Sequence, residues 1–401
     1  MKRLTLAVLP LCGLMFPTSA VYADDLAAAL VGGKTTLNLR VRHEQVDDDA
    51  LAKTADASTL RARLSYASQQ WRGFELGLEV DHVAHLFSER FNDTRNGKAN
   101  FPVVPDPDGT DLNQAFITYK VAKSALTAGR QRININNQRF VGGVGWRQNE
   151  QTYDALRFSS KDLDKVSFDY IYVDKTHRIF GPEKGLPLED LQSDHHIVAV
   201  SWQPSSALTL GAYAYLLDFD DAAALSSRTL GGYASGTFQV APVKLDYRVE
   251  SARQTDYGNN PADFSVDYHH LVLGASAAGV RVAVAQETLG ADQGAGVAMQ
   301  TPLATMHAFQ GWADKFLNTP ASGVRDQYVS VNTTVKGTAL AAIWHQYDAD
   351  VGSAKLGSEL NLQASRKFMN RYTLTAKYAN YQADTFARDT QKIWLMAEAS
   401  F

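Results

Sequence analysis

Hydrophobic and polar residues alternate along most of the chain, in segments of about ten residues. In residues 37–42, for example, three aliphatic side chains alternate with Asn38, Arg40 and Arg42. Alternation with a period of two places apolar side chains on one face of a β-strand and polar side chains on the other. We therefore predict about 18 strands, at residues 35–46, 58–70, 73–85, 112–121, 124–133, 150–160, 164–177, 193–204, 207–218, 227–240, 243–255, 265–277, 279–289, 326–336, 338–349, 357–369, 372–383 and 389–401.

The connections between these segments are alternately short and long. The short ones lie at residues 71–72, 122–123, 161–163, 205–206, 241–242, 278, 336–337 and 370–371. The longer ones lie at residues 47–57, 86–111, 134–149, 178–192, 219–226, 256–264, 290–325, 350–356 and 384–388. Outer-membrane barrels combine short periplasmic turns with long extracellular loops, whereas a soluble sandwich gives no reason for this alternation. The pattern predicts an all-β fold, a transmembrane antiparallel β-barrel with both termini in the periplasm.

The last predicted strand, residues 389–401, ends the sequence on Phe401. Its apolar residues alternate with mixed ones, as on a strand with an apolar outer face. This segment resembles the closing strand of Gram-negative outer-membrane barrels, in which a terminal aromatic residue resembles the signal read by the barrel-insertion machinery. We therefore expect Phe401 to act as an insertion signal. The alternative is an ordinary terminal strand of a soluble sheet.

Residues 1–23 have the features of a secretory signal peptide. Two basic residues precede an apolar run over residues 4–16, and a small-x-small cleavage site ends at Ala23. The run is too short to span a membrane. We expect residues 24–401 to form a single domain in the outer membrane of a Gram-negative bacterium. The one cysteine, Cys12, lies in the predicted signal peptide, so no disulfide is expected.

Charge and hydropathy narrow the class of protein. The formal net charge is −4 at pH 7, which excludes a basic nucleic-acid-binding protein. Mean hydropathy is −0.25, and after the predicted signal peptide no apolar run approaches the roughly 18 residues of a membrane-spanning helix. A barrel remains compatible with these values, because its polar lumen keeps mean hydropathy low.

Charged side chains occupy the polar faces of several predicted strands. An arginine or lysine facing lipid at mid-depth costs about 2–4 kcal/mol, so these faces are expected to line a water-filled lumen. The basic residues on them are Arg40, Arg42, Arg61, Arg63, Lys244 and Arg248. Guanidinium groups bind carboxylates in bidentate fashion, so we expect these side chains to attract anionic solutes. The alternative for the first four is cross-strand pairing, since the neighbouring strand carries Glu75, Glu79 and Asp81.

A second group of arginines is close in sequence and spans one strand–loop–strand unit. It consists of Arg130, Arg132, Arg139, Arg147 and Arg157. We expect these side chains to converge at one height and form a positive constriction, with Asp154 on the face opposite Arg157. The faces of residues 124–133 are ambiguous, and Gly129 is a candidate for a bulge that resets them. The alternative is that these arginines form structural cross-strand pairs.

Two stretches resemble the alginate-export family of outer-membrane proteins. The first combines Gly-Arg-Gln-Arg-Ile at 129–133, Gln-Arg-Phe-Val-Gly at 138–142, Gly-Trp-Arg-Gln-Asn at 145–149 and Thr-Tyr-Asp-Ala-Leu at 152–156. The second is Phe-Gln-Gly-Trp-Ala-Asp-Lys-Phe-Leu at 309–317, followed by Gly-Val-Arg-Asp at 323–326. The resemblance implies an 18-stranded barrel and, in the name-giving members, passage of an anionic polysaccharide. Many relatives share only the domain, so the substrate does not transfer automatically.

The longest predicted loop, residues 290–325, has apolar residues from Met306 to Leu317 at the spacing of a short amphipathic helix. Such a helix could fold into the barrel as a partial plug or pack on other loops at the surface. The sequence leaves both arrangements open, and it also leaves open whether loop 86–111 enters the lumen.

No metal site or cofactor is expected. Acidic segments at 47–49, 106–109 and 218–221 lack the ligand series of an EF-hand. Adjacent histidines at 195–196 and 269–270 lie on strands, so they point in opposite directions and cannot chelate one ion together.

We predict an outer-membrane channel for passive passage of small or polymeric anionic solutes, with export of a uronate-type polysaccharide as one candidate. A barrel of about 18 strands is wide enough to leave an aqueous channel. The expected partners are outer-membrane lipid, the barrel-insertion machinery and the anionic solute, with no nucleic acid. One alternative is a barrel enzyme such as a lipid hydrolase, which needs serine, histidine and an acid together on the lipid-facing rim. The other is a general unselective porin.

Overall fold

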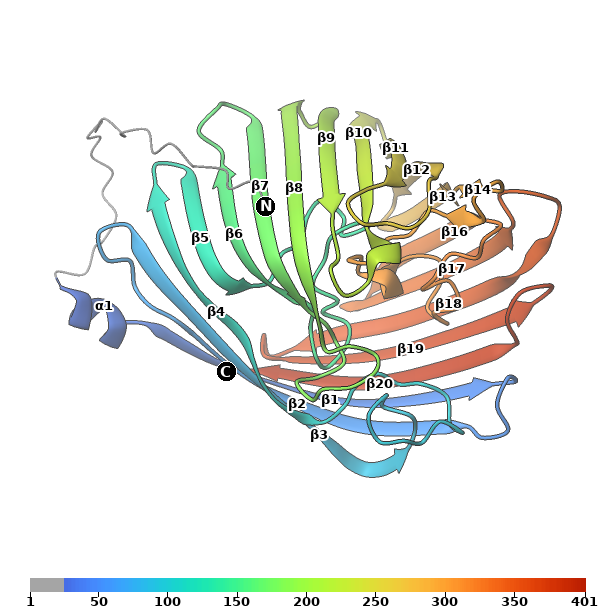
Figure 1. Ribbon diagram of the computed structural model, residues 1–401, viewed down its shortest axis with the longest axis horizontal. Coiled ribbons are helices and arrows are strands. Elements are labelled where there is room, and N and C mark those ends of the chain that lie inside the picture. Colours follow the sequence, from blue (N-terminus) through green and yellow to red (C-terminus); the bar gives the residue numbers. More distant parts are fainter. Residues whose placement is uncertain (1–24) are drawn as a thin grey trace.

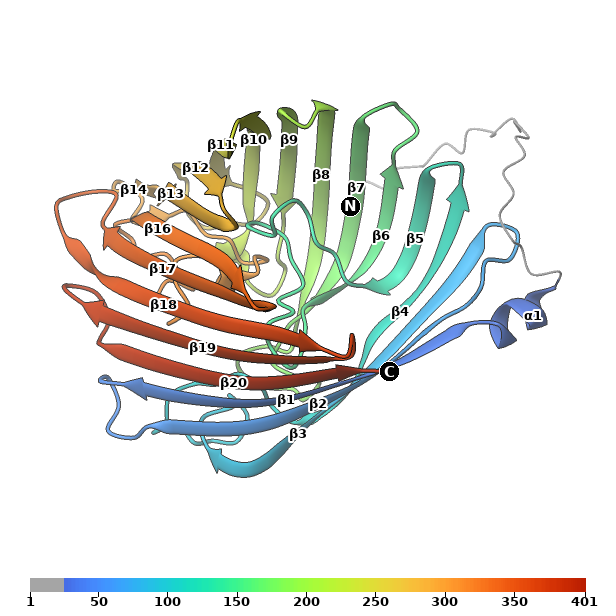
Figure 2. The same cartoon turned by 180° about the vertical axis from the view of Figure 1, so that it is seen from behind.

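A computed structural model describes residues 25–401, so the predicted signal peptide, residues 1–23, lies outside the described residues. The strands form one 18-stranded sheet in which every pairing is antiparallel and the last strand returns beside the first. Figures 1 and 2 show this wall, with the red strand β20 next to the blue strand β1 in both views. The predicted 18-stranded antiparallel barrel is therefore confirmed.

The strands of the barrel coincide with the alternating segments of the sequence. Their bounds are β1 (Lys34–Asp48), β2 (Ala55–Ala67), β3 (Phe74–Arg90), β4 (Gly109–Val121), β5 (Ser124–Gln131), β6 (Thr152–Ser160), β7 (Val166–His177), β8 (Asp190–Ser205), β9 (Leu208–Leu217), β10 (Ser227–Val240), β11 (Val243–Asp256), β12 (Ser265–Ala277), β13 (Val280–Leu289), β16 (Val324–Val335), β17 (Thr338–Asp348), β18 (Lys355–Phe368), β19 (Tyr372–Ala383) and β20 (Thr390–Ser400). Each predicted strand is present, with ends that differ by a few residues.

The remaining elements are short. They are α1 (Leu26–Val31), the 3₁₀ helices η1 (Ala223–Leu225) and η2 (Met306–Ala308), and a separate hairpin of β14 (Ala291–Asp292) and β15 (Val297–Ala298). No helix within residues 25–401 combines the length and apolar character needed to cross a membrane.

Pairing between β1 and β20 closes the barrel. Val41 pairs with Ala397 in antiparallel register along this seam. The amide of Phe401 donates to the carbonyl of Leu37 at 2.9 Å, and the amide of Leu37 donates back to the carbonyl of Phe401 at 3.1 Å. Closure pairs the strand edges that an open sheet would leave exposed.

Side-chain burial follows the alternation of the sequence. On β1, Leu37 and Val41 are 37% and 41% exposed, whereas Arg40 and Arg42 are 5% and 0% exposed. The apolar side chains face outward and the charged side chains face inward, which is the reverse of a soluble protein. This arrangement suits a wall with lipid outside and a polar lumen inside.

The short turns at one end of the barrel hold consecutive strands together. At Ala278 and Gly279 the φ angles are 49° and 78°, and at Lys336 and Gly337 they are 47° and 78°. Two central residues with positive φ are typical of a type I′ turn, whose twist matches that of paired strands. The long connections all lie at the opposite end, as the sequence pattern predicted.

The prediction of an amphipathic helix within residues 306–317 is wrong. Beyond η2 the backbone has positive φ at Gln310 (48°) and Asp314 (60°), values outside the right-handed helical region. The amides of this segment find partners on the wall instead, since the Trp312 amide donates to the Glu359 carboxylate at 2.5 Å. Apolar spacing alone did not distinguish a helix from a chain of turns packed against the barrel.

Candidate functional site

Two long loops fold into the barrel and contact each other there. They are residues 132–151, between β5 and β6, and residues 299–323, between β15 and β16. The amide of Gly142 donates to the carbonyl of Leu303 at 2.9 Å, and Val141 forms a β-bridge with Leu303. Loop segments lie inside the curve of the wall in Figures 1 and 2. We call these two loops together the plug.

The loop of residues 132–151 reaches two separate parts of the wall through buried arginines. Arg139 donates to Glu287 of β13 at 2.6 Å, and Arg147 pairs with Glu44 of β1 at 3.0 Å. Strands β1 and β13 are not neighbours in the sheet, so this loop crosses the lumen. A buried charge is costly without a partner, so each pair holds the loop in place.

The loop of residues 299–323 is held by Asp314. Its carboxylate accepts hydrogen bonds from Lys392 of β20 and from His307, both at 2.8 Å, and lies 3.6 Å from Arg147. Burial by itself raises the pKa of Asp314, but Lys392, His307 and Arg147 together hold this pKa well below its usual range. Asp314 is therefore ionised at neutral pH and links both loops to the wall.

His307 connects Asp314 to a second wall lysine. The Nζ atom of Lys377 on β19 lies 2.8 Å from Nε2 of His307. An ammonium group can only donate, so Nε2 accepts and the ring proton sits on Nδ1, which donates to Asp314. Burial lowers the pKa of His307 to about 3, so the ring is neutral at pH 7. The indole of Trp146 stacks on it at 4.5 Å, which joins the two loops through their side chains.

Two cavities lie on either side of residues 306–314. The first, of about 450 Å³, opens among the long loops and is lined by Met306 and Asp314. The second, of about 290 Å³, lies below the plug and is lined by Phe309 and Trp312. The plug therefore separates a space at the long-loop end from a space within the strands.

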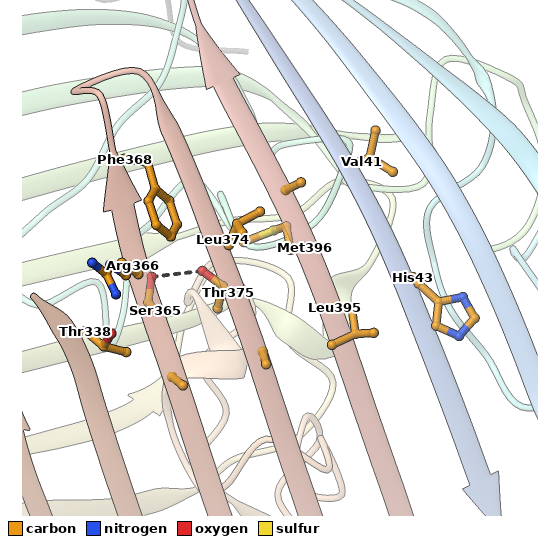
Figure 3. A pocket seen from close by; sticks show the side chains of 13 residues that line it. Val41, His43, Thr338, Ser365, Arg366, Phe368, Leu374, Thr375, Leu395 and Met396 are labelled. Carbon is orange, nitrogen blue, oxygen red and sulfur yellow. Dashed lines mark hydrogen bonds between the residues drawn. The ribbon is translucent and has the colours of Figure 1, made fainter. Parts of the chain in front are cut away.

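A larger groove, of about 560 Å³, lies outside the barrel across β18, β19, β20 and β1 (Figure 3). Its lining includes Val41, Leu374 and Leu395, which are 41%, 51% and 55% exposed. These side chains belong to the outward apolar face that contacts lipid. The groove is thus separate from the lumen and from the plug.

The arginines predicted on β1 lie inside the wall and contact the plug. Arg40 donates to the Trp146 carbonyl at 3.1 Å, and Arg42 donates to the same oxygen. Arg42 also pairs with Asp106 at 3.3 Å, with both side chains fully buried. These arginines hold the loop rather than facing open water.

The arginines predicted on β2 form cross-strand pairs. Arg63 binds Asp81 of β3 through two hydrogen bonds, at 2.7 Å and 2.6 Å, and also donates to Glu150 at 2.8 Å. Arg61 lies 3.9 Å from Glu150, and its Nε and Nη1 atoms have no hydrogen-bond partner in the described chain. The cross-strand pairing considered as the alternative for these arginines is therefore present, although Arg61 keeps two donor atoms without a partner in the described chain.

The five arginines of the second group do not converge, and Arg130 departs furthest from expectation. Pairing of β4 with β5 continues without a bulge through Gly129 and Phe116. Arg130 therefore stays on the same face of β5 as Leu126, which is 43% exposed on the outside. It pairs there with Asp154 at 2.9 Å. The prediction that Arg130 lines the lumen is wrong, because Gly129 does not reset the faces.

The other members of this group lie inside the wall, each beside a carboxylate. Arg132 donates to Glu79 at 2.7 Å and also pairs with Glu150. Arg157 pairs with Asp169 of β7 at 2.6 Å, while the two plug arginines reach β13 and β1. These arginines therefore do not form the expected positive constriction. They form a network of ion pairs spread across the lumen.

Lys244 and Arg248 of β11 have different surroundings. Arg248 pairs with Glu250 at 2.6 Å, and its guanidinium lies 4.1 Å from the centre of the Tyr233 ring. Lys244 is exposed near the short turn at residues 241–242. Of these two basic residues, Arg248 is therefore the one that lies next to an aromatic side chain of the barrel.

The sequence did not single out Arg178, which lines the first cavity, or Arg95, which contacts the same loop. Arg178 lines this cavity and donates to the Leu188 carbonyl at 3.2 Å. Arg95 donates to the carbonyls of Phe180 and Pro187, at 3.2 Å and 2.7 Å. Burial and then the charge of Arg95 lower the pKa of Arg178, and no carboxylate among residues 25–401 offsets them. Both arginines lie in loops without periodicity, so no sequence pattern pointed to them.

Serine–histidine contacts on the outside of the barrel bear on the enzyme alternative. Nδ1 of His43 lies 3.1 Å from the Ser58 hydroxyl and 3.6 Å from a carboxylate oxygen of Asp56. A hydrolase relay needs the serine and the acid on different nitrogens of the ring. Here both approach Nδ1, so this contact is not arranged as a relay.

Comparisons with known proteins agree with this architecture. A family model described as alginate export matches residues 34–293. A search of curated protein sequences gave no significant match. The solved structure of OccAB4 from Acinetobacter baumannii is similar, with a TM-score of 0.73 and 15% identity over 92% of this chain and 98% of that one. OpdK from Pseudomonas aeruginosa has a TM-score of 0.73 and 14% identity over 93% and 99% of the two chains. A structure of OpdK with vanillate gives 0.72 and 13% over the same shares.

Proposed function

The chain belongs to the alginate-export family of outer-membrane channels, and we propose that it passes small organic anions with an apolar part. Passage is passive, and the solute first binds in the 450 Å³ cavity at the long-loop end. One observation carries the proposal. Among the described residues that line this cavity, Arg178 is the cation without a carboxylate partner, whereas Lys315 and Lys392 pair with acids.

The chemistry of the cavity suits such a solute. Its walls include Leu51, Pro105, Phe180 and Met306, which offer apolar and aromatic surface. The Arg178 guanidinium supplies donors that match the geometry of a carboxylate. A cavity of this volume lies within the range of small-molecule sites. Vanillate, present in one OpdK structure, is itself an aromatic carboxylate.

A uronate polysaccharide is the alternative that the family description suggests. A polymer spans both cavities at once, so residues 306–314 have to leave the lumen during its passage. Removing the whole plug also breaks the buried pairs Arg139–Glu287 and Arg147–Glu44. A small solute needs only a local movement of the plug. The geometry therefore favours small anions.

Block of the ion current in planar bilayers tests the proposal. We expect benzoate to block the purified channel at lower concentration than an oligouronate. Arg178→Gln should weaken the benzoate block at least about tenfold, since a hydrogen-bonded charge contributes about 1.5–3 kcal/mol. Arg130→Gln is the matched control, because this arginine lies on the outer face, and it should leave the block unchanged. Stronger block by the oligouronate, or an unchanged benzoate block in Arg178→Gln, would contradict the proposal.

A further inference from the structure

A histidine and two aspartates meet at the long loop between β3 and β4, apart from the plug contacts described above. His85 lies on β3, Asp93 near the start of the loop, and Asp108 just before β4. One ligand atom from each lies within 4.8 Å of the others. We propose that this cluster is a binding site for a divalent metal ion of the zinc class.

Asp93 is the observation that points to a ligand. Its side chain is 2% exposed, and Oδ1 accepts hydrogen bonds from the amides of Arg95 and Asn96 at 2.6 Å and 2.7 Å. These bonds fix the carboxylate and leave Oδ2 directed at Nε2 of His85, 3.8 Å away. Among residues 25–401, no hydrogen bond reaches Oδ2 and no lysine or arginine pairs with Asp93. A buried carboxylate in this state is costly unless a cation compensates it.

His85 does not donate a hydrogen bond to Asp93. Nε2 lies 3.0 Å from the carbonyl oxygen of Asp106, so its proton is directed at that oxygen and not at Asp93. When a metal binds, the ring proton moves to Nδ1, the neutral tautomer that leaves Nε2 free to coordinate. The Asp106 carbonyl is then positioned as a further oxygen ligand.

The spacing and ligand types favour zinc over calcium. Ligands at about 2.1 Å from a tetrahedral ion lie about 3.4 Å apart, close to the 3.0 Å and 3.8 Å observed around Nε2. An imidazole nitrogen suits Zn²⁺, whereas Ca²⁺ takes six to eight oxygen ligands. Phe91, fully buried, packs edge-on against the His85 ring at 4.8 Å and holds it in place.

The proposed site ties the loop to the mouth of the first cavity. Residues 102, 103 and 105 of this loop line that cavity, and the Asp106 side chain binds Arg42 and the Gln148 amide of the plug. A bound ion would join both ends of the loop to β3. Its effect is to hold the cavity wall in one conformation.

Metal titration of the purified full-length channel tests this inference. The protein, without a histidine tag and stripped with a chelator, is titrated with Zn²⁺ against a chromophoric competitor. We expect one Zn²⁺ per chain, and in trypsin digestion Zn²⁺ should protect the bonds after Arg95 and Lys98. Asp108→Asn should weaken Zn²⁺ binding at least about tenfold, since even outer-shell partners contribute that much.

The variants separate metal binding from folding. Asp108 is exposed and makes no hydrogen bond within the described chain, so Asp108→Asn should fold normally. His85→Gln should weaken Zn²⁺ binding by a similar factor. Asp263→Asn, another exposed loop aspartate, is the matched control and should bind Zn²⁺ like the wild type. Equal affinity in Asp108→Asn and wild type, no stoichiometric Zn²⁺ binding, or binding of Ca²⁺ in its place would overturn the inference.

Discussion

Replacing Asp314 by asparagine should release the plug without weakening the wall. The side chain keeps its size but loses the charge that joins Lys392, His307 and Arg147. Breaking a buried ion pair by removing one partner costs about 3–5 kcal/mol. Arg147 retains Glu44 at 3.0 Å, whereas Lys392 loses its carboxylate, so we take the lower end of this range.

A cost of about 3 kcal/mol shifts the balance between docked and released plug by about a hundredfold. The hydrogen bonds between strands are untouched, so the melting temperature of the barrel should stay close to that of the wild type. Single-channel recording in planar bilayers should show long openings about a hundred times more often in Asp314→Asn. The conductance of those openings should also exceed the usual level, because the lumen is then unobstructed.

The matched control is Asp326→Asn. The side chain of Asp326 is 1% exposed, against 8% for Asp314, but its partner His345 lies on the neighbouring strand of the wall, 2.9 Å away. This change should lower the stability of the barrel and leave the frequency of openings unaltered. If Asp314→Asn opens no more often than wild type, or if both variants open equally often, Asp314 does not hold the plug in the lumen.

Three further predictions follow from single contacts. His307 has a pKa of about 3 when the plug is docked and an ordinary value near 6.5 when it is released. As the pH falls, His307 is therefore protonated in the released plug before it is protonated in the docked plug. Docking therefore weakens as pH falls from about 6.5 towards 3, and openings should rise by up to about tenfold per pH unit, a dependence that His307→Gln should flatten. Arg132→Gln leaves Glu79 and Glu150 with less positive charge and should move the reversal potential towards cations, whereas Arg130→Gln should not. Deleting Phe401, whose backbone pairs with Leu37 at the seam, should lower the amount in the outer membrane more than folding in detergent; equal outer-membrane levels would count against this.

The wall could be predicted from the sequence because its pattern is local. Each strand buries one face in lipid, so alternation alone determines which side chains point inward, as Leu37 and Arg40 illustrate. The same rule placed Arg63 on the inner face, and the structure pairs it there with Asp81 of the neighbouring strand. Because consecutive strands are antiparallel, alternating short and long connections predict short turns at one end of the barrel and long loops at the other.

The plug could not be predicted, because its contacts join residues that are distant in sequence and follow no period. Arg139 and Glu287 are 148 residues apart, and nothing near either one marks the other as its partner. For Arg130 the error was local. Only Gly fits at position 129, where a Cβ would lie 2.4 Å from the Ala115 carbonyl, so the glycine reflects a close approach of strands and not a bulge.

The reversal potential across a salt gradient measures directly whether the lumen selects anions. The purified channel in a planar bilayer separates two concentrations of potassium chloride, and then of potassium benzoate. We predict a preference for the anion in both salts, a smaller preference in Arg178→Gln, and no change in Arg130→Gln. Cation selectivity would show that the arginines do not set the selectivity of the lumen, and equal permeability to both ions in wild type and Arg178→Gln would indicate an unselective porin with structural arginines.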